Sequence, residues 1–439
     1  MPGVGTSDSA GVVGDRNSGR FSPARQLAWP VILVSLLASA LLSGIARADY
    51  SNPPSVLGTI TVGNAPRGIA ITPNGKFAYV ANTNDGTVSA IDLKTNLVTS
   101  TITVGTQPIG IAITPNGQRA YVAMYGLNLV KVLDLSTNTV VAGADITTGV
   151  GPYGVALSAD GNRLYVTNYG AGSLSVVDTT TTPASVTTVT VGTNPWGVAV
   201  TPDGTKAYVT NSGSASVSAI DPSTTPPTVT TFAVSGSTPT GVAFTPDGGQ
   251  ALVVNNGGAV QRNSIITTAT NATVDFATSG QSGGAAITPN GATALIAING
   301  TEKVSFLNLA SRAYTSSLTT PPNGSGPWGI AITRDGTRAY VTLNNQNLVS
   351  IIDLGWVSPG GAGEAPVVPQ APPQEFAVPA GTPASACAGL APNWVVWGGL
   401  EGMQRLGWAL SWSQWPNGGR GGNVCTRLPS WSNGGWTLD

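Results

Sequence analysis

Short hydrophobic segments alternate with polar turns along most of the chain. In the first such stretch, four segments are rich in β-branched residues and partly alternate hydrophobic with polar positions: 67–72 (RGIAIT), 77–82 (FAYVAN), 87–93 (TVSAIDL) and 97–105 (LVTSTITVG). Gly, Asn, Asp and Pro separate these segments, as is typical of strands joined by tight turns. The stretch therefore predicts four consecutive short β-strands.

The same pattern occurs seven times. Each copy contains the string Pro-x-Gly-(Ile/Val)-Ala, except the sixth, which has Ser-Gly-Gly-Ala-Ala. Successive repeat glycines are 42, 44, 43, 44, 43 and 45 residues apart, at Gly68, Gly110, Gly154, Gly197, Gly241, Gly284 and Gly329. Four strands in a repeat of this length are typical of a propeller blade. We therefore expect an all-β, seven-bladed β-propeller over residues 49–355.

The two ends of the repeat array predict how the ring closes. The last copy has only three strands, at 329–333, 338–343 and 348–354. An additional strand at 56–63 (VLGTITVG) precedes the first copy and is similar in sequence to the fourth strand of that copy. If this N-terminal strand completes the last blade, the ring has no open sheet edge.

The second strand of each copy carries a recognisable signature. Tyr-Val-Thr-Asn occurs at 165–168 and 208–211, and Tyr-Val-Ala-Asn at 79–82. The chain resembles the YVTN β-propeller repeat family of exported bacterial and archaeal proteins, which includes YncE-like periplasmic proteins and surface-layer proteins. The resemblance implies a seven-bladed propeller outside the cytoplasm. It implies little about chemistry, because propellers have many functions.

Composition removes several classes of function. Only 9% of the residues are charged and the net charge is −1, so no broad positive field would attract a phosphate backbone, and we expect no nucleic-acid partner. The chain has no histidine, which removes the commonest general base and every His-ligated metal site. We expect neither a metal ion nor a cofactor.

An acidic or amide residue before a glycine recurs in every copy. It is Asn in three copies and Asp in four: Asn74, Asn116, Asp160, Asp203, Asp247, Asn290 and Asp335. A general acid or a calcium ligand would need the charge, whereas a turn needs only a short polar side chain followed by Gly. We therefore assign these residues to hairpin turns. The predicted innermost strands contain no carboxylate, so we expect no catalytic residue on the channel wall.

The residue between Pro and Gly differs from copy to copy. It should lie near the channel mouth, where each innermost strand begins, and it is Arg67, Ile109, Tyr153, Trp196, Thr240, Gly283 and Trp328. We select Arg67, Tyr153, Trp196 and Trp328 as candidate ligand-binding residues, because aromatic rings on a rim could stack on a sugar or another flat ligand. The alternative is that these rings cap the hydrophobic core between blades.

The N-terminal residues have the features of an export signal. Three arginines precede an apolar run at 28–45, and Ala46-Arg47-Ala48 has the form of a signal-peptidase site. We expect residues 1–48 to be a signal peptide cleaved after Ala48, which leaves a mature chain that does not span a membrane. An uncleaved anchor is the alternative. With either a cleaved signal peptide or an uncleaved anchor, we expect the protein to be located in the periplasm, the cell envelope or the extracellular space.

The C-terminal residues depart from the repeat. Residues 356–385 are rich in Pro, Gly and Ala and predict a linker. Residues 386–439 contain seven of the eleven Trp residues and predict a small module that a Cys387–Cys425 disulfide would staple. Trp408, Trp412 and Trp415 are candidate binding residues for a glycan or an envelope component. Alternatively, these rings form the core of the module.

Together these features predict a function without catalysis. We expect an exported binding or scaffold protein whose partner is an unidentified envelope protein or a glycan. The alternative is a propeller enzyme such as a metal-dependent lactonase or lyase, which would normally place carboxylate or His ligands around the axis.

Overall fold

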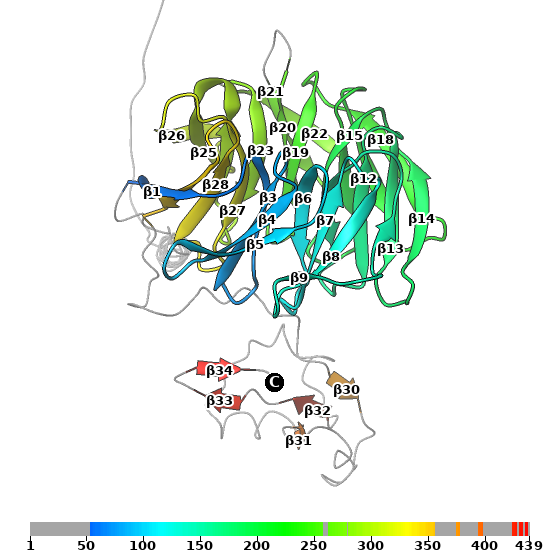
Figure 1. The fold of residues 1–439 in the computed structure, drawn as a ribbon. Helices are drawn as coiled ribbons and strands as arrows, with labels where there is room; N and C mark the ends of the chain where they lie inside the picture. The colour runs from blue at the N-terminus through cyan, green and yellow to red at the C-terminus, as the bar shows by residue number, and fades with distance from the viewer. Residues whose placement is uncertain are drawn as a thin grey trace, which may run out of the picture.

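The computed structural model describes residues 53–257, 262–278 and 280–355, together with five short strands between residues 375 and 437. The described residues between 53 and 355 form seven separate sheets arranged around an axis (Figure 1). The first strands of neighbouring blades contact one another in an unbroken circuit, from β2 through β27 and back to β2. This confirms the predicted all-β, seven-bladed propeller, in which the first strand of each repeat is innermost.

Blades 1 to 3 follow one another along the chain. Blade 1 contains β2 (Pro66–Ile71), β3 (Phe77–Asn82), β4 (Thr87–Asp92) and β5 (Leu97–Thr103). Blade 2 contains β6 (Pro108–Ile113), β7 (Arg119–Met124), β8 (Leu129–Asp134), β9 (Thr139–Val140) and β10 (Ile146–Thr147). Blade 3 contains β11 (Pro152–Leu157), β12 (Arg163–Asn168), β13 (Ser173–Asp178) and β14 (Ser185–Thr190).

Blades 4 to 6 have the same order. Blade 4 contains β15 (Pro195–Val200), β16 (Ala207–Asn211), β17 (Ser216–Asp221) and β18 (Thr228–Ala233). Blade 5 contains β19 (Pro239–Phe244), β20 (Gln250–Asn255), β21 (Arg262–Thr267) and β22 (Ala272–Ala277). Blade 6 contains β23 (Ser282–Ile287), β24 (Thr293–Ile298), the 3-10 turn η1 (Asn299–Thr301), β25 (Lys303–Asn308) and β26 (Ala313–Thr319).

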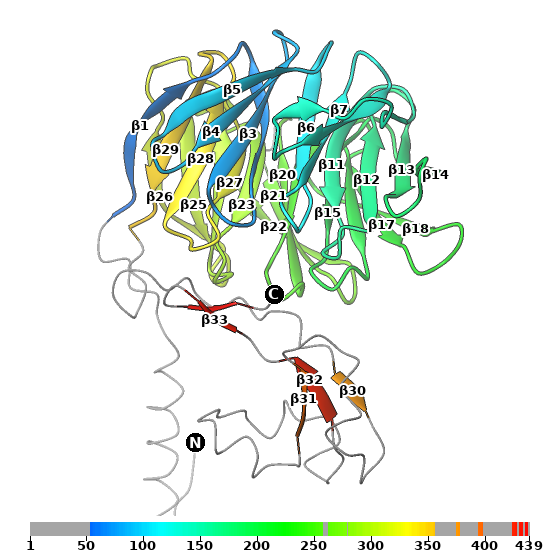
Figure 2. The same cartoon turned by 60° about the horizontal axis from the view of Figure 1, so that its bottom comes forward.

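Blade 7 is assembled from both ends of the propeller. It contains β27 (Pro327–Ile332), β28 (Arg338–Leu343) and β29 (Leu348–Asp353), and its outermost strand is β1 (Ser55–Thr61). Strand β1 pairs with β29 in antiparallel register, from Ser55 opposite Asp353 to Thr61 opposite Leu348. Figure 2 shows β1 alongside β29. The predicted closure by the N-terminal strand is confirmed.

One blade differs from the four-strand expectation. The outer edge of blade 2 is divided into β9 and β10, which pair with different parts of β8. The residues between them, 141–145 (VAGAD), include a glycine in the left-handed region, Gly143, with a φ of 72°. A glycine with this backbone conformation interrupts a regular strand.

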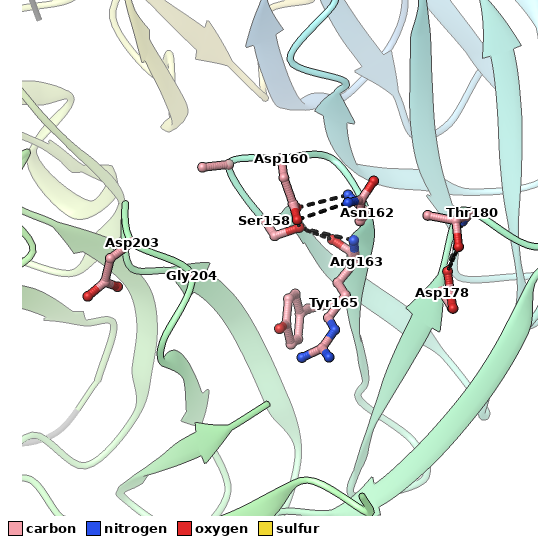
Figure 3. Close-up of a pocket in the computed structure, with 10 residues that line it drawn as sticks. Ser158, Asp160, Asn162, Arg163, Tyr165, Asp178, Thr180, Asp203 and Gly204 are labelled. Carbon is pink, nitrogen blue, oxygen red and sulfur yellow. Dashed lines mark hydrogen bonds between the residues drawn. The ribbon is translucent and has the colours of Figure 1, made fainter. Parts of the chain in front are cut away.

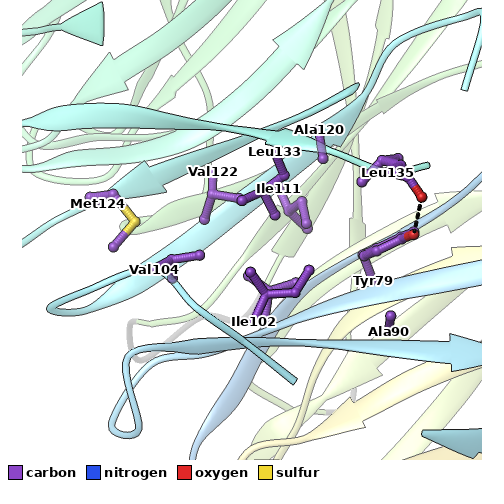
Figure 4. Close-up of a cluster of buried hydrophobic side chains, with 11 residues drawn as sticks. Tyr79, Ala90, Ile102, Val104, Ile111, Ala120, Val122, Met124, Leu133 and Leu135 are labelled. Atoms are coloured by element: carbon purple, nitrogen blue, oxygen red, sulfur yellow. Dashed lines mark hydrogen bonds between the residues drawn. The ribbon is translucent and has the colours of Figure 1, made fainter. Parts of the chain in front are cut away.

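The hydrophobic core lies between blades. One cluster joins Tyr79, Ile102 and Val104 of blade 1 to Val122 and Leu133 of blade 2, all of them buried (Figure 4). Burying an aliphatic side chain of this size stabilises the folded chain by about 1.5–3 kcal/mol. Because each blade packs one face of its sheet against each neighbouring blade, no blade has a complete core without the rest of the ring.

The repeat glycine is required where innermost strands meet. A Cβ atom on Gly329 of blade 7 would lie 2.3 Å from the carbonyl oxygen of Arg67 in blade 1. On Gly154 of blade 3 it would lie 2.4 Å from the carbonyl oxygen of Trp196 in blade 4. A side chain here would separate the strands, which explains why the repeat keeps Gly at this position.

The threonine of the Tyr-Val-Thr-Asn signature bonds across the same boundary. The Thr167 hydroxyl accepts the Gly154 N–H at 2.7 Å and donates to the carbonyl of Trp196 in the next blade at 2.8 Å. The Thr342 hydroxyl likewise donates to the carbonyl of Arg67 at 2.8 Å. This one hydroxyl therefore binds its own innermost strand to the neighbouring blade.

The signature tyrosine makes a second link between blades. The buried Tyr79 donates its hydroxyl to the side-chain oxygen of Asn138 in blade 2 at 2.8 Å, and Tyr340 of blade 7 reaches Asn96 of blade 1 at 3.2 Å. Both asparagines have φ values near 56°, a left-handed conformation that Asn tolerates well. Blade 4 has no Asn in this turn, and the buried hydroxyl of Tyr165 has no hydrogen-bond partner among the described residues.

The chain beyond the propeller contributes only short strands to the described residues. β30 (Glu375–Ala377), β32 (Val424–Arg427) and β31 (Trp394–Trp397) form one sheet, and β33 (Ser430–Ser432) pairs with β34 (Gly435–Thr437). The predicted Cys387–Cys425 disulfide, the side chains Trp408, Trp412 and Trp415, and the signal peptide at 1–48 lie outside what the structure describes. Within its described parts there is no helix suited in length and hydrophobicity to crossing a membrane.

Replacing Gly154 by Ala should destabilise the propeller by about 1–3 kcal/mol, because the new Cβ overpacks the boundary between blades 3 and 4. Urea unfolding followed by circular dichroism measures this loss. Gly300→Ala is the control, since its nearest neighbouring atom would be 3.8 Å away, and it should change stability by less than about 0.5 kcal/mol. Equal stability of the two variants would contradict the close approach.

Candidate functional site

Four rim residues occupy equivalent positions in four blades. Arg67, Tyr153, Trp196 and Trp328 are each the second residue of an innermost strand, in β2, β11, β15 and β27. The proline before each of them pairs with the last residue of the second strand, as Pro195 does with Asn211. The four residues therefore lie at one end of the propeller, together with the loops that join the second and third strands.

These side chains meet across the ring although their blades are not all neighbours. The ring centroids of Tyr153 and Trp196 are 4.3 Å apart, and those of Trp196 and Trp328 are 6.0 Å apart. The Arg67 guanidinium lies 5.4 Å from the Trp328 ring centroid and donates from Nη1 to the Tyr153 hydroxyl at 3.0 Å. Residues of blades 1, 3, 4 and 7 thus form one cluster.

Two further tyrosines complete this group. Tyr125 and Tyr169 directly follow the second strands of blades 2 and 3. Tyr169 lies 6.0 Å from Tyr153 and 5.7 Å from Trp196, and Tyr125 lies 6.3 Å from Tyr153, measured between ring centroids. Sequence reasoning did not select either residue, although a Tyr-Gly pair after the signature in two adjacent copies was a usable signal. We call Arg67, Tyr125, Tyr153, Tyr169, Trp196 and Trp328 the axial aromatic cluster.

The other rim positions have structural roles. Ile109 is buried, and Thr240 donates its hydroxyl to the carbonyls of Ser282 and Gly283 in the neighbouring blade, both at 3.0 Å. Neither residue has a ring to offer a ligand. The rim therefore divides into positions that hold blades together and positions that supply the cluster.

Tyr153 is the buried centre of the cluster and the other rings are partly exposed. Tyr153 has a relative exposure of 6%, whereas Tyr125, Tyr169, Trp196 and Trp328 each keep part of their surface accessible. Burial raises the pKa of Tyr153, and the charge and hydrogen bond of Arg67 offset only part of this shift. Tyr153 is therefore a neutral phenol at physiological pH.

None of these rings belongs to an interblade core. The clusters of buried apolar residues between blades contain the signature tyrosines, such as Tyr79 and Tyr208, but not Tyr153, Trp196 or Trp328. The axial aromatic cluster is thus distinct from the clusters of buried apolar residues between the blades.

A polar cleft lies at the same end of the propeller, between blades 1 and 2. Its volume is about 460 Å³, and it is lined by hydroxyl, amide and glycine residues and one carboxylate: Thr83, Asn84, Asp85, Gly86, Thr103, Gly105, Thr106 and Gln107. Asp85 accepts the backbone N–H of Asn64 at 2.7 Å. Hydrogen-bonding groups thus accompany the aromatic surface at this end.

A second cleft, of about 490 Å³, lies at the opposite end and is formed by hairpin turns of blades 3 and 4. Figure 3 shows Asp160 bonded within its own turn, Asp178 bonded to Thr180, and Asp203 on the adjacent blade. Asp203 accepts the backbone N–H of Thr205 at 3.0 Å. These carboxylates are engaged by their own turns.

All seven predicted turn residues make the same bond, whether Asn or Asp. Each accepts the backbone N–H two residues further on, at 2.9 or 3.0 Å: Asn74, Asn116, Asp160, Asp203, Asp247, Asn290 and Asp335. Their assignment to turns is confirmed. Among the described residues, no three Asp, Glu, Cys or His side chains come together in a group that could hold a metal ion.

Comparison with known proteins shows the family to which the chain belongs. Residues 28–331 match the family model described as the YNCE-like beta-propeller. The chain belongs to the YncE-like β-propeller family. This confirms the resemblance drawn from the Tyr-Val-Thr-Asn repeats. No curated protein matches this YncE-like chain in sequence.

Solved structures of similar fold come from diverse proteins. A chain of Kuenenia stuttgartiensis hydrazine synthase is 22% identical, with a TM-score of 0.58, over 66% of this chain and 95% of that one. Virginiamycin B lyase from Staphylococcus aureus is 14% identical, with a TM-score of 0.58 and coverage of 69% and 99%. The Cps50 (Swd1) propeller domain of Myceliophteria thermophila is 14% identical, with a TM-score of 0.59 and coverage of 69% and 99%. At these identities the similarity shows the fold alone.

Replacing Asp203 by Asn should leave stability at pH 7 within about 1 kcal/mol of the parent, because the turn bond survives. The Thr201 hydroxyl and the Thr205 N–H lower the pKa of Asp203 in the folded chain. Its charge therefore stabilises the fold above the pKa of unfolded Asp, and this contribution is lost as pH falls through the lower, folded-state pKa. The variant should lose less stability than the parent between pH 7 and pH 3 in urea titrations. An equal or steeper acid loss in the variant would show that the carboxylate has no such role.

Proposed function

We propose that this YncE-like chain is an exported, non-catalytic binding protein, that its ligand site is the axial aromatic cluster, and that its ligand is a saccharide. The observation that carries the proposal is the meeting of Trp196 and Trp328 from blades 4 and 7, with Tyr169 beside Trp196. Partly exposed aromatic rings grouped in this way are typical of surfaces on which the apolar faces of sugar rings stack.

The surroundings of the cluster support a saccharide. Sugar hydroxyls need both donors and acceptors, and the polar cleft at the same end supplies these through Asn84, Thr106 and Gln107. The Asn194 side chain donates to the Tyr169 hydroxyl at 3.3 Å, which places an amide at the edge of the cluster. An aromatic surface bordered by amides and hydroxyls suits a sugar better than it suits a wholly apolar ligand.

Export rests on the N-terminal sequence. The apolar run at 28–45 is followed by Ala46-Arg47-Ala48, the form that signal peptidase cleaves. Saccharides are abundant outside the cytoplasm, so the compartment and the site chemistry agree. The lyase or lactonase alternative has no comparable observation in its favour, because the described residues offer no group of acidic ligands around the axis.

Replacing Trp196 and Trp328 by Ala together should weaken saccharide binding by at least tenfold, since each stacking ring supplies about 1 kcal/mol or more. The full chain and the variant would be compared on an array of bacterial and plant oligosaccharides, with affinities for positive ligands measured by calorimetry. Phe232→Ala is the control, because Phe232 contacts Tyr208, at 6.0 Å between centroids, and not the cluster. Undiminished binding by the double variant would contradict the proposal.

A further inference from the structure

Arg67 is the charged member of the axial aromatic cluster. Its guanidinium donates from Nη1 to Tyr153 and lies over the ring of Trp328. Both partners are neutral, and no carboxylate among the described residues forms an ion pair with Arg67. Because the side chain is partly buried among rings, its charge lacks both full hydration and a counter-charge.

The hydrogen bond to Tyr153 leaves most donors of the Arg67 guanidinium unpaired. Nε is buried and has no hydrogen-bond partner, and Nη2 bonds to no described residue. Since Tyr153 engages one Nη1 donor, four of the five N–H donors are unpaired, and of these the Nη2 donors are not buried as Nε is. A carboxylate can accept charge-assisted hydrogen bonds from these Nη2 donors.

We propose that Arg67 recognises a carboxylate on the ligand, so that the chain selects acidic saccharides of the uronic-acid class over neutral ones. This inference rests on the proposed function, because the aromatic rings must hold the sugar for its carboxylate to reach Arg67. Trp196 and Trp328 stack on the sugar, Tyr169 borders it, and Nη2 of Arg67 donates to the carboxylate. Tyr153 fixes the guanidinium from its opposite side.

The surroundings favour a single carboxylate over a polyanion. Among the described residues, no second Lys or Arg bonds to any ring of the cluster. Binding a nucleic acid or a polyphosphate requires several cations, whereas one guanidinium suffices for one carboxylate. The geometry also predicts that Lys is a poor substitute for Arg67, because a single ammonium nitrogen does not reproduce the planar fork in which Nη1 bonds Tyr153 and Nη2 stays unpaired.

The test uses two probes that differ only at their carboxyl groups, trigalacturonic acid and its fully methyl-esterified form, which carries no charge. Calorimetry with the full chain should show the acid binding at least tenfold more tightly than the ester. Raising NaCl from about 0.05 to about 0.5 M should weaken binding of the acid more than binding of the ester. Arg67→Gln should reduce affinity for the acid by a larger factor than affinity for the ester, so that the preference for the acid is lost, and Arg67→Lys should recover only part of that preference.

The outcomes separate this inference from the proposed function. If the parent binds acid and ester equally, and Trp196→Ala with Trp328→Ala abolishes both, the saccharide site stands and the role of Arg67 is wrong. If Arg67→Gln weakens both probes equally, Arg67 only supports the cluster, and the inference also fails. If neither probe binds to the parent at millimolar concentration, the acidic-saccharide inference fails, and the array decides the proposed function separately.

Discussion

The close approach of the seven innermost strands is the constraint on which the structure depends. At the boundary between blades 7 and 1, Gly329 lies so near the carbonyl of Arg67 that a Cβ atom would be 2.3 Å from it, and Gly154 is in the same position relative to Trp196. The signature threonines Thr342 and Thr167 bond to the same two carbonyls. These contacts fix the backbone of each rim residue at a defined distance from its neighbour.

Fixing the rim backbones also brings their side chains together. Arg67 and Trp328 are far apart in the sequence, yet they become neighbours because β1 pairs with β29 and completes the last blade. Trp196 comes from the other side of the ring, and its ring meets that of Trp328. The axial aromatic cluster is therefore a product of ring closure, and no single blade contains it.

Sequence reasoning succeeded where the repeat itself provided a control. Asp203 could be assigned to a turn because Asn74, Asn116 and Asn290 fill the same position in other blades. The closing strand could be found because the last copy lacked its fourth strand and an unpaired strand preceded the first. In both cases the comparison needed only the periodicity of this one chain.

Other features depend on distances that periodicity does not encode. The rim residues could be placed at one mouth, but their contacts across the ring depend on the channel radius and on side-chain length. Tyr125 and Tyr169 were missed because they follow the strands and do not begin them, so attention to the innermost strands excluded them. The division of the blade 2 edge into β9 and β10 depends on Gly143, a local deviation that the average repeat conceals.

The central claim is that rings from separate blades form one ligand surface at the axis. Hydroxyl-radical footprinting with mass spectrometry tests it most directly, by measuring oxidation of each aromatic residue of the full chain with and without trigalacturonic acid. The account predicts that Trp196, Trp328 and Tyr169 are protected together, while Phe276 and Tyr314, which contact each other in blades 5 and 6, oxidise unchanged. Protection confined to the C-terminal Trp residues, or to the turns around Asp203, would contradict it.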